Sequence, residues 1–133
     1  MRTLLKGLLV PVVLSLGLFA QSAELRGTLD QTGGKPVLKT QDGETVALEG
    51  VSDTLKVLLD KRLEGMDLGV AGQRVGPHTF RIGPFNKKTL WVNRDGKRYM
   101  VTYWCPVCFI RAYTPGPCQC CQRYTDLDLV EIK

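Results

Sequence analysis

The stretch KPVLKTQDGETVALEGVSDTLKVLLDKRLEG, residues 35–65, decides the fold because its hydrophobic period changes half-way along. Its first half holds two short runs, residues 37–40 and 45–48, on either side of Asp42-Gly43. An Asp-Gly pair between two alternating runs is a strong signal for a β-hairpin. We therefore expect two antiparallel strands in this half.

The second half of the stretch predicts a helix. Four leucines recur at helical spacing and would line one face, namely Leu55, Leu58, Leu59 and Leu63. Ser52 or Asp53 is expected to cap the start of this helix, and Gly65 to end it. A leucine face of this kind is typical of a helix that packs on a core.

Further strands are expected on both sides of this hairpin and helix. Residues 24–29 precede them, and residues 66–75 and 78–83 follow around a Gly-Pro turn. The order strand, strand, strand, helix, strand, strand resembles the OB-fold, a five-stranded barrel with one helix between its third and fourth strands. The expected fold class is mainly β, as a small OB-like barrel or an open sheet with one helix.

Residues 89–104, TLWVNRDGKRYMVTYW, predict a second hairpin with Asp95-Gly96 as its two-residue turn. In this register Val92 lies opposite Tyr99, and large apolar side chains point to both faces. The hairpin is therefore expected to pack on both sides. Near the end of the chain, residues 127–132 alternate and predict a last strand that joins the same sheet.

The beginning of the chain, MRTLLKGLLVPVVLSLGLFAQSAEL, predicts a secretory signal peptide. A basic start precedes an apolar run at residues 8–19, and Ala20-Gln21-Ser22 supplies small residues at the cleavage positions. The run is shorter than the roughly 18–20 residues that cross a bilayer. We expect cleavage after residue 22 or one residue later, and an exported mature chain without a membrane span, either periplasmic or secreted.

Three segments follow from these patterns. Residues 1–22 form the signal peptide, residues 23–83 the OB-like part, and residues 84–133 a hairpin with a cysteine-rich segment packed on it. Removing residues 1–22 takes away two of the 18 basic residues and none of the 13 acidic ones, so the net charge falls from +5 to +3. A positive excess this small does not indicate nucleic-acid binding. We therefore do not expect a nucleic-acid partner.

All five cysteines fall within residues 103–124, YWCPVCFIRAYTPGPCQCCQRY. Two CxxC units joined by a loop suit tetrahedral zinc, because each short turn directs two thiolates at one ion. The segment resembles a zinc ribbon, whose cysteine turns also follow a strand and often have the pattern C-P-x-C. The expected ligands of a closed, structural zinc site are Cys105, Cys108, Cys118 and Cys121, with Cys120 as an alternative to Cys121.

Other uses of the same cysteines stay open. An exported protein meets an oxidising compartment, where two disulfides and one spare thiol would form without any metal. Clustered thiols also suit copper(I), or thiol–disulfide exchange. The CPVC motif is superficially similar to the active sites of thioredoxin-like oxidoreductases, but Pro115 and Pro117 leave no room for the helix that those sites need. A thioredoxin fold is therefore excluded.

Enzymatic machinery is not indicated by the sequence. His78 is the single histidine, and no pair of carboxylates is marked as acid and base. A candidate ligand-binding surface gathers basic and aromatic residues of the second hairpin, namely Trp91, Arg94, Lys97, Arg98 and Tyr99. Its partner would be a protein or an anionic surface. The sequence thus predicts an exported, non-enzymatic binding or structural module stabilised by zinc, or alternatively a protein that handles copper or thiols.

Overall fold

The computed structural model of the protein describes residues 22–133. The predicted signal peptide falls almost entirely on residues 1–21, which lie outside the described residues. Among residues 22–133, no helix is long and apolar enough to cross a membrane.

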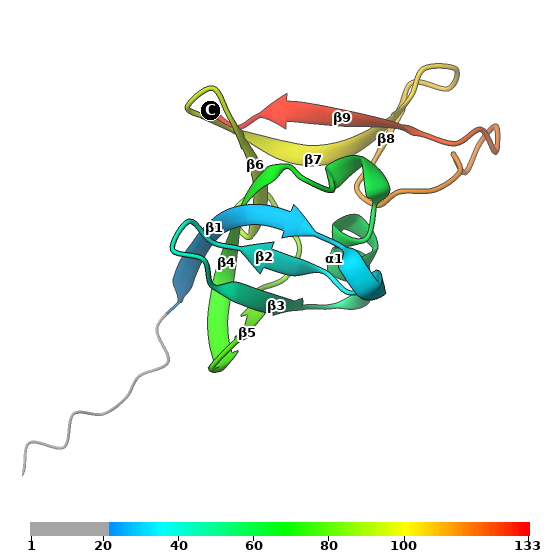
Figure 1. The fold of residues 1–133 in the computed structure, drawn as a ribbon. Coiled ribbons are helices and arrows are strands. Elements are labelled where there is room, and N and C mark those ends of the chain that lie inside the picture. Colours follow the sequence, from blue (N-terminus) through cyan, green and yellow to red (C-terminus); the bar gives the residue numbers. More distant parts are fainter. Residues whose placement is uncertain (1–21) are drawn as a thin grey trace, which may run out of the picture.

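Strands dominate the described part of the chain, which also holds one α-helix and two short 3-10 helices (Figure 1). The elements are β1 (Ala23–Asp30), η1 (Thr32–Gly34), β2 (Val37–Lys39), β3 (Thr45–Glu49), α1 (Ser52–Leu58), η2 (Lys61–Leu63), β4 (Asp67–Gly76), β5 (Thr79–Ile82), β6 (Leu90–Arg94), β7 (Lys97–Cys105), β8 (Ile110–Ala112) and β9 (Asp126–Glu131). All nine strands belong to one hydrogen-bonded sheet.

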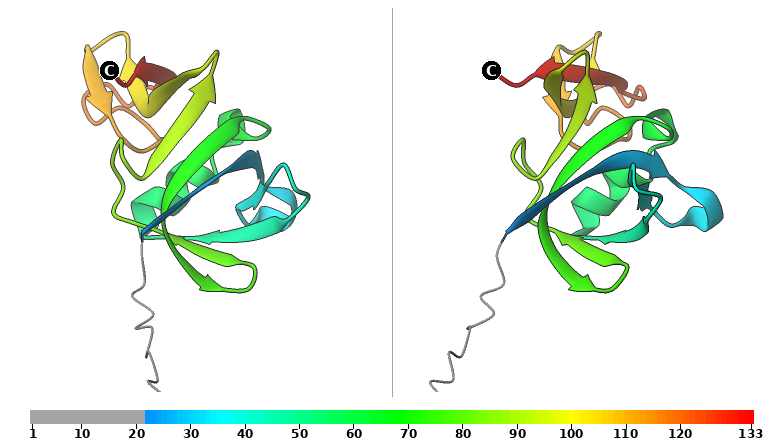
Figure 2. Two further views of the ribbon diagram at one scale, coloured as in Figure 1. Left: turned by 90° about the vertical axis from the view of Figure 1, so that its left-hand side faces the viewer. Right: turned by 60° about the vertical axis from the view of Figure 1, so that its left-hand side comes forward.

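The first five strands close into a barrel. β1 pairs antiparallel with both β2 and β4, β2 pairs with β3, and β4 pairs with β5. The parallel pair β3–β5 completes the ring, so that its order β1-β2-β3-β5-β4 returns to β1. With α1 between β3 and β4, this is a closed, OB-like barrel (Figures 1 and 2). The predicted mainly β class is confirmed, and the barrel form is the one that the chain adopts.

The core of the barrel extends into the second hairpin without a break. Fifteen fully or almost fully buried side chains form it, namely Leu29, Leu38, Val46, Leu48, Val57, Leu58, Leu63, Leu68, Val70, Phe80, Ile82, Leu90, Val92, Val101 and Tyr103. They come from the barrel strands, from α1 and η2, and from β6 and β7. The hairpin therefore shares its packing with the barrel.

The helix is shorter than the leucine spacing predicts. It ends at Leu58, and a 3-10 turn then carries Leu63 into the same core. Asp60 separates the two pieces because its backbone is extended and its carboxylate accepts the N–H of Arg62. The predicted end at Gly65 is therefore wrong.

The expected cap of this helix is also wrong. Ser52 and Asp53 both lie inside the first turn, and the capping position is Val51, which offers no side-chain hydrogen bond. The extended backbone of Val51 (φ −66°, ψ 163°) leads the chain from the barrel into the helix. Packing of the apolar face therefore fixes where the helix begins, as it does for most helices in proteins.

The second hairpin has the predicted register. Val92 pairs with Tyr99, and Arg94 pairs with Lys97. Asp95 and Gly96 have φ values of 52° and 74°, the left-handed conformations that a tight hairpin turn requires. β6 also pairs with β4, so the hairpin continues the sheet of the barrel.

The hairpin packs on both of its faces, as predicted. Val101 and Tyr103 enter the core on one face. On the other face, the indole of Trp91 lies directly over Gly69 of β4, where any added Cβ atom would collide with the ring. The guanidinium of Arg98 also stacks on that ring, 4.4 Å from its centroid.

The long strand β7 carries the last two strands on its two edges. β9 pairs with it over six residue pairs, which confirms the predicted final strand. β8, which the sequence did not predict, pairs with the last three residues of β7 on the other edge. Within residues 22–133, the outer edge of β9 carries no strand. The cysteine segment projects from this end of β7, above the barrel (Figures 1 and 2).

Candidate metal centre

The first cysteine turn reverses the chain between β7 and β8. Cys105 is the last residue of β7 and pairs with Ile110, the first residue of β8. Between them, Phe109 adopts a left-handed conformation (φ 54°), and its N–H donates to the carbonyl oxygen of Cys105 at 2.9 Å. This tight turn holds Cys105 and Cys108 on the same side of the chain.

The second cysteine turn repeats this geometry. Gln122 follows Cys121 as Phe109 follows Cys108, and it too is left-handed (φ 65°). Its N–H donates to the carbonyl oxygen of Cys118 at 2.9 Å. Because the two turns match, Cys118 and Cys121 correspond to Cys105 and Cys108. Cys120, the second of the two residues between Cys118 and Cys121, corresponds to Val107.

The two turns bring four thiols together. The Sγ atoms of Cys105, Cys108, Cys118 and Cys121 all lie within 4.8 Å of one another. The Sγ atoms of Cys105 and Cys121 are 3.6 Å apart, and the N–H of Cys108 donates to the sulfur of Cys105 at 3.4 Å. All five cysteines are among the described residues, and none of them forms a disulfide. Such a group could hold a metal ion.

The thiol cluster has an inner and an outer side. Cys105 and Cys118, the first cysteines of the two turns, are buried, with exposed fractions of 1% and 3%. Cys108 is half-buried, and Cys120 and Cys121 are exposed. The second cysteine of each turn therefore faces solvent, and the fifth cysteine lies on that side as well.

The thiols differ in how easily they lose a proton. Backbone N–H groups of Cys121 and Cys120 hydrogen-bond the sulfur of Cys118 and lower the pKa of that thiol to about 7. Contact with the thiol of Cys120, followed by burial, raises the pKa of Cys108. For Cys121, the N–H of Arg123 favours the thiolate, but partial desolvation of the sulfur and the thiol of Cys105 outweigh it and raise the pKa of Cys121. Among the three thiols whose pKa is shifted, Cys118 is the one in which the thiolate is favoured.

Arg62 connects the barrel to the loop that carries the second turn. Its guanidinium donates to the carboxylate of Asp60 at 2.9 Å and to the carbonyl oxygen of Thr125 at 2.9 Å. The same guanidinium lies 5.3 Å from the ring centroid of Tyr103 and 5.6 Å from that of Tyr124. Burial alone would raise the pKa of Asp60, but the hydrogen bonds from Arg62 outweigh burial and lower it.

A second arginine holds the first turn. Arg111 of β8 donates to the hydroxyl of Thr102 at 2.6 Å and to the carboxylate of Asp128 at 2.7 Å. It also covers the ring of Trp104, 5.0 Å from its centroid. Since these partners belong to β7 and β9, Arg111 ties all three strands together beside the thiols.

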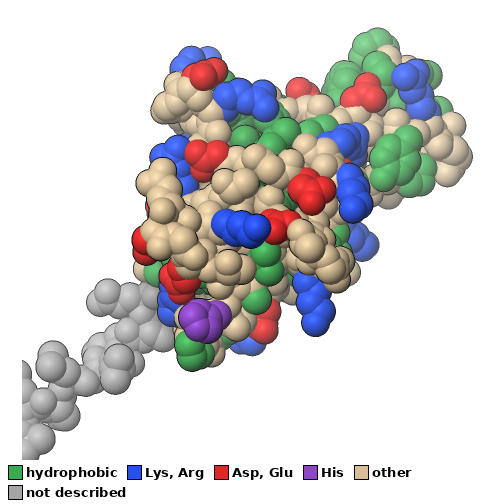
Figure 3. Space-filling view, in the orientation of Figure 1, with side chains coloured by type: hydrophobic (Ala, Val, Ile, Leu, Met, Phe, Trp, Pro, Cys, Tyr) green, Lys and Arg blue, Asp and Glu red, His purple; other side chains and the backbone are tan. Residues whose placement is uncertain are grey.

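The segment that carries the thiols, residues 105–125, buries very little apolar surface; we call it the cysteine lobe. It holds five of the eight large hydrophobic side chains that are exposed in the described part of the chain. These five are Val107, Phe109, Ile110, Tyr113 and Tyr124. Hydrophobic side chains gather visibly at this end of the molecule, at the upper right of Figure 3. The lobe is therefore not held together by a hydrophobic core of its own.

The residues of the predicted ligand-binding surface divide between the two faces of the second hairpin. Trp91 and Arg98 stack on each other and line a cleft with Glu24 and Arg26 of β1. Tyr99 points to the opposite face and packs against the core.

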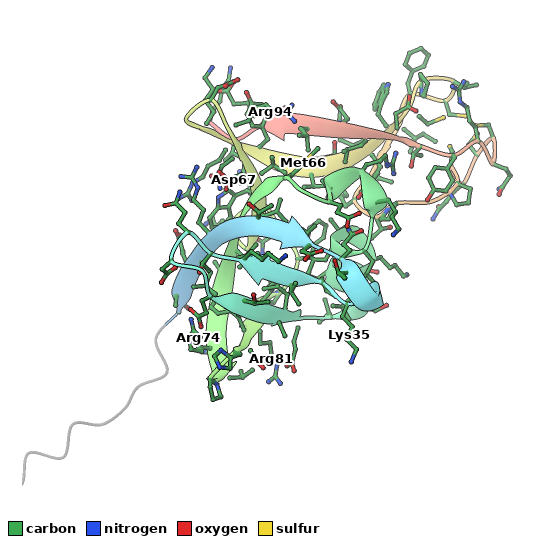
Figure 4. The ribbon with its side chains drawn as sticks, viewed as in Figure 1. Lys35, Met66, Asp67, Arg74, Arg81 and Arg94 are labelled. Atoms are coloured by element: carbon green, nitrogen blue, oxygen red, sulfur yellow. The ribbon has the colours of Figure 1, made fainter. Side chains whose placement is uncertain are left out.

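The remaining two residues of that surface, Arg94 and Lys97, flank the hairpin turn. Lys97 pairs with Glu131 at 3.7 Å. Figure 4 shows Arg94 beside β9, far from Arg74 and Arg81 at the lower end of the barrel. The basic side chains of the protein are therefore spread over separate regions.

Four residues that shape the site carry no recognisable signal in the sequence. Arg62 and Arg111 act through contacts with distant elements, which no local pattern indicates. Phe109 and Gln122 adopt left-handed conformations, for which glycine is the usual residue. Because neither is a glycine, the sequence does not indicate either turn. A glycine directly after the second cysteine of each CxxC unit would have indicated that the chain turns there in a left-handed conformation.

Comparisons with protein-family models, with curated proteins and with solved structures find no match to this chain. The arrangement of the chain's own residues must therefore carry any conclusion on function. That arrangement is a closed β-barrel that supports, through β7, a cluster of four thiols.

Proposed function

We propose that this protein is a small exported, non-enzymatic binding or structural module whose cysteine lobe is organised by one zinc ion. Its ligands would be Cys105, Cys108, Cys118 and Cys121. The observation that carries the proposal is the convergence of these four sulfur atoms, all within 4.8 Å of one another, from two turns of matching geometry.

The dimensions of the thiol cluster fit zinc. Four sulfur atoms at about 2.3 Å from a central ion stand about 3.8 Å from each other in a tetrahedron. Cys105 and Cys121 have sulfur atoms 3.6 Å apart, close to this value and far from the roughly 2.05 Å of a disulfide bond. The donor set contains thiols alone, which suits a closed structural site that leaves no position open for catalysis.

The bound ion would supply cross-links that the lobe otherwise lacks. Metal coordination would join the end of β7 to the loop before β9, and so fix residues 105–125 although few of their side chains are buried. Fixed in this way, the exposed apolar and aromatic side chains of the lobe would form a defined surface on which a protein partner could pack.

Export is proposed from the N-terminal pattern of a basic start, an apolar run and small residues at the cleavage site. Its test is the mass of the chain recovered from the exported fraction of the cell that makes it. A mass that lacks residues 1–22 would support export. Full-length chain confined to the cell interior would contradict it.

The direct test of the metal site combines metal content with a count of free thiols on purified protein. We expect one zinc per chain, with about four thiols that react only after denaturation and chelation. Two disulfides without any metal would contradict the proposal.

A metal-handling role is the second candidate, because one side of the thiol cluster faces solvent. In that case zinc or copper(I) would be a cargo that the site releases to another ligand. The measurement that separates the two candidates is the rate at which the ion leaves. A structural ion stays for the lifetime of the fold, whereas a cargo ion exchanges with a competing chelator while the barrel stays folded.

A further inference from the structure

The fifth cysteine is not required by the turn in which it lies. Cys120 occupies the third position of the second turn, and the equivalent position of the first turn is Val107. Both turns have the same hydrogen bond and the same left-handed residue after the second ligand. A side chain without a thiol therefore supports this turn equally well, and the sulfur of Cys120 needs another explanation.

The position of Cys120 places its sulfur at the outer side of the cluster. It immediately precedes Cys121 and is exposed, as Cys121 is. It is not one of the four thiols whose sulfur atoms lie within 4.8 Å of one another, but it belongs to the residue directly before one of them, Cys121. The two inner ligands, Cys105 and Cys118, are buried and thereby protected from competing ligands.

We propose that Cys120 is an exchange thiol, which displaces Cys121 or Cys108 from the bound ion and so opens the site to transfer of the ion to an incoming thiolate or chelating ligand. This inference rests on the metal site proposed above and assigns a role that a purely structural site would not have. The partner that it implies is an acceptor with thiolate or nitrogen ligands of its own.

The step is a ligand substitution without oxidation or reduction. The thiol of Cys120 gives its proton to solvent, and its sulfur forms a bond to the ion. The bond from the ion to the sulfur of Cys121 breaks, and that thiolate takes up a proton from solvent. Four metal–sulfur bonds exist before and after the step. During this exchange, the coordination position on the outer side of the ion passes from the sulfur of Cys121 to that of Cys120. An external ligand can take the same position while the two sulfur atoms exchange.

The inner ligands would keep the ion bound during this exchange. The sulfur of Cys105 accepts the N–H of Cys108 at 3.4 Å, and both inner ligands, Cys105 and Cys118, are buried. Such a hydrogen bond favours the thiolate and stabilises a ligated sulfur. Release would therefore proceed from the outer side inward.

The test compares zinc release by the wild-type full chain with that by Cys120→Ser. Protein loaded with one equivalent of zinc under oxygen-free conditions, with a phosphine reductant that keeps thiols reduced, is mixed with the chromogenic chelator 4-(2-pyridylazo)resorcinol. A thiol attached one residue from a ligand has an effective concentration in the millimolar range, so with chelator at tens of micromolar we expect about tenfold slower release from the variant. The control is Gln119→Ala, an exposed neighbour without a thiol, which should release zinc at the wild-type rate.

Three outcomes would count against the proposal, and they differ from one another. If Cys120→Ser holds one zinc and releases it as fast as wild type, Cys120 is not an exchange thiol. If Cys120→Ser no longer holds zinc although its circular dichroism shows a folded barrel, Cys120 is a permanent ligand. If wild-type protein itself holds no zinc, the proposed metal site fails, and this inference fails with it.

Discussion

The barrel and the cysteine lobe are stabilised in opposite ways. The barrel and the second hairpin share fifteen buried apolar side chains, and the five barrel strands are hydrogen-bonded in a ring without a free edge. In residues 105–125, by contrast, only Cys105, Cys118 and Thr125 are buried. One region thus folds by excluding water, whereas the other depends on a few polar and thiol contacts.

Because the lobe has little apolar core, its order depends on its contacts with the barrel and on the thiol cluster. Strand β7 reaches it from the barrel side and delivers Cys105, while Arg62 contacts the loop at Thr125. The thiol cluster supplies the remaining cross-link between the two turns. Changes to the barrel, to the Arg62 contact and to the thiol cluster should therefore have effects that can be told apart.

The largest effect is expected from removing the metal. Binding of zinc by four thiolates contributes on the order of 10 kcal/mol to the folding of small domains, so its loss should unfold the lobe. Amide hydrogen exchange measured by mass spectrometry should show that residues 105–125 lose protection after chelation, while the barrel strands keep it. Loss of protection in both regions together would show that the barrel also depends on the ion.

The next largest effect is expected from Phe80→Ala. The side chain is fully buried in β5, and truncation of a buried phenylalanine costs about 3–5 kcal/mol. Urea unfolding should show this loss for the whole protein, with or without metal. The control is Val75→Ala in the neighbouring β4, which is 43% exposed and should change stability by less than about 0.5 kcal/mol. Equal effects of the two variants would contradict the assignment of the core.

A smaller effect is expected from Arg62→Met, which removes the connection between barrel and lobe. The carboxylate of Asp60, only 6% exposed, would lose its partner, at a cost of about 1–3 kcal/mol. The control is Arg26→Met, whose partner Asp67 is 40% exposed and whose loss should cost no more than about 1 kcal/mol. Urea unfolding of the zinc-loaded proteins at pH 7 measures both values.

The same variant makes a prediction on pH. In the wild type, hydrogen bonds from Arg62 lower the pKa of Asp60 below its ordinary value of 3.8. A carboxyl whose pKa is lower in the folded state contributes its full stability above the unfolded pKa, and that contribution is lost as the pH falls below it. The difference in unfolding free energy between wild type and Arg62→Met should therefore shrink between pH 5 and pH 2. A difference that stays constant over this range would contradict the role given to the pair.

The smallest effect is expected from Gln122→Gly. Gln122 has a φ of 65°, a conformation that costs a residue with a side chain roughly 1–2 kcal/mol and glycine nothing. Part of that gain is offset by the greater flexibility of glycine in the unfolded chain, so a net stabilisation of about 0.5 kcal/mol is expected. A chelator titration of the zinc-loaded protein should show slightly tighter zinc retention. Weaker retention would indicate that the Gln122 side chain itself supports the turn.

Much of the fold could be predicted from local patterns. The Asp-Gly turns, the alternation of Thr45–Glu49 and the register of Val92 against Tyr99 depend on neighbouring residues, and the structure confirms them. Closure of the barrel could not be decided, because the β3–β5 pair joins residues about thirty positions apart. The end of the helix was missed because Leu63 keeps the helical spacing although it lies in a separate 3-10 turn.

The candidate site was partly predictable for the same reason. The CxxC spacing indicates which cysteines can converge, and the structure brings four of them together. Strand β8 was missed because the turn before it uses Phe109 in a left-handed conformation that the sequence does not mark. The contact of Arg62 with Thr125 spans sixty-three positions, and only the folded chain can show it.

Within the described residues 22–133 no strand pairs with the outer edge of β9, and this bears on how the protein behaves at high concentration. An unpaired strand edge is a template on which a second molecule can add a strand, which is how many β-proteins begin to aggregate. β9 has the sequence DLDLVE, with Asp126 at one end and Glu131 at the other. Antiparallel pairing of two copies in register would set Asp126 opposite Glu131 of the second copy, and like charges directly opposite each other are destabilising. The carboxylates of Asp126 and Glu131 therefore disfavour the pairing of two copies along this edge.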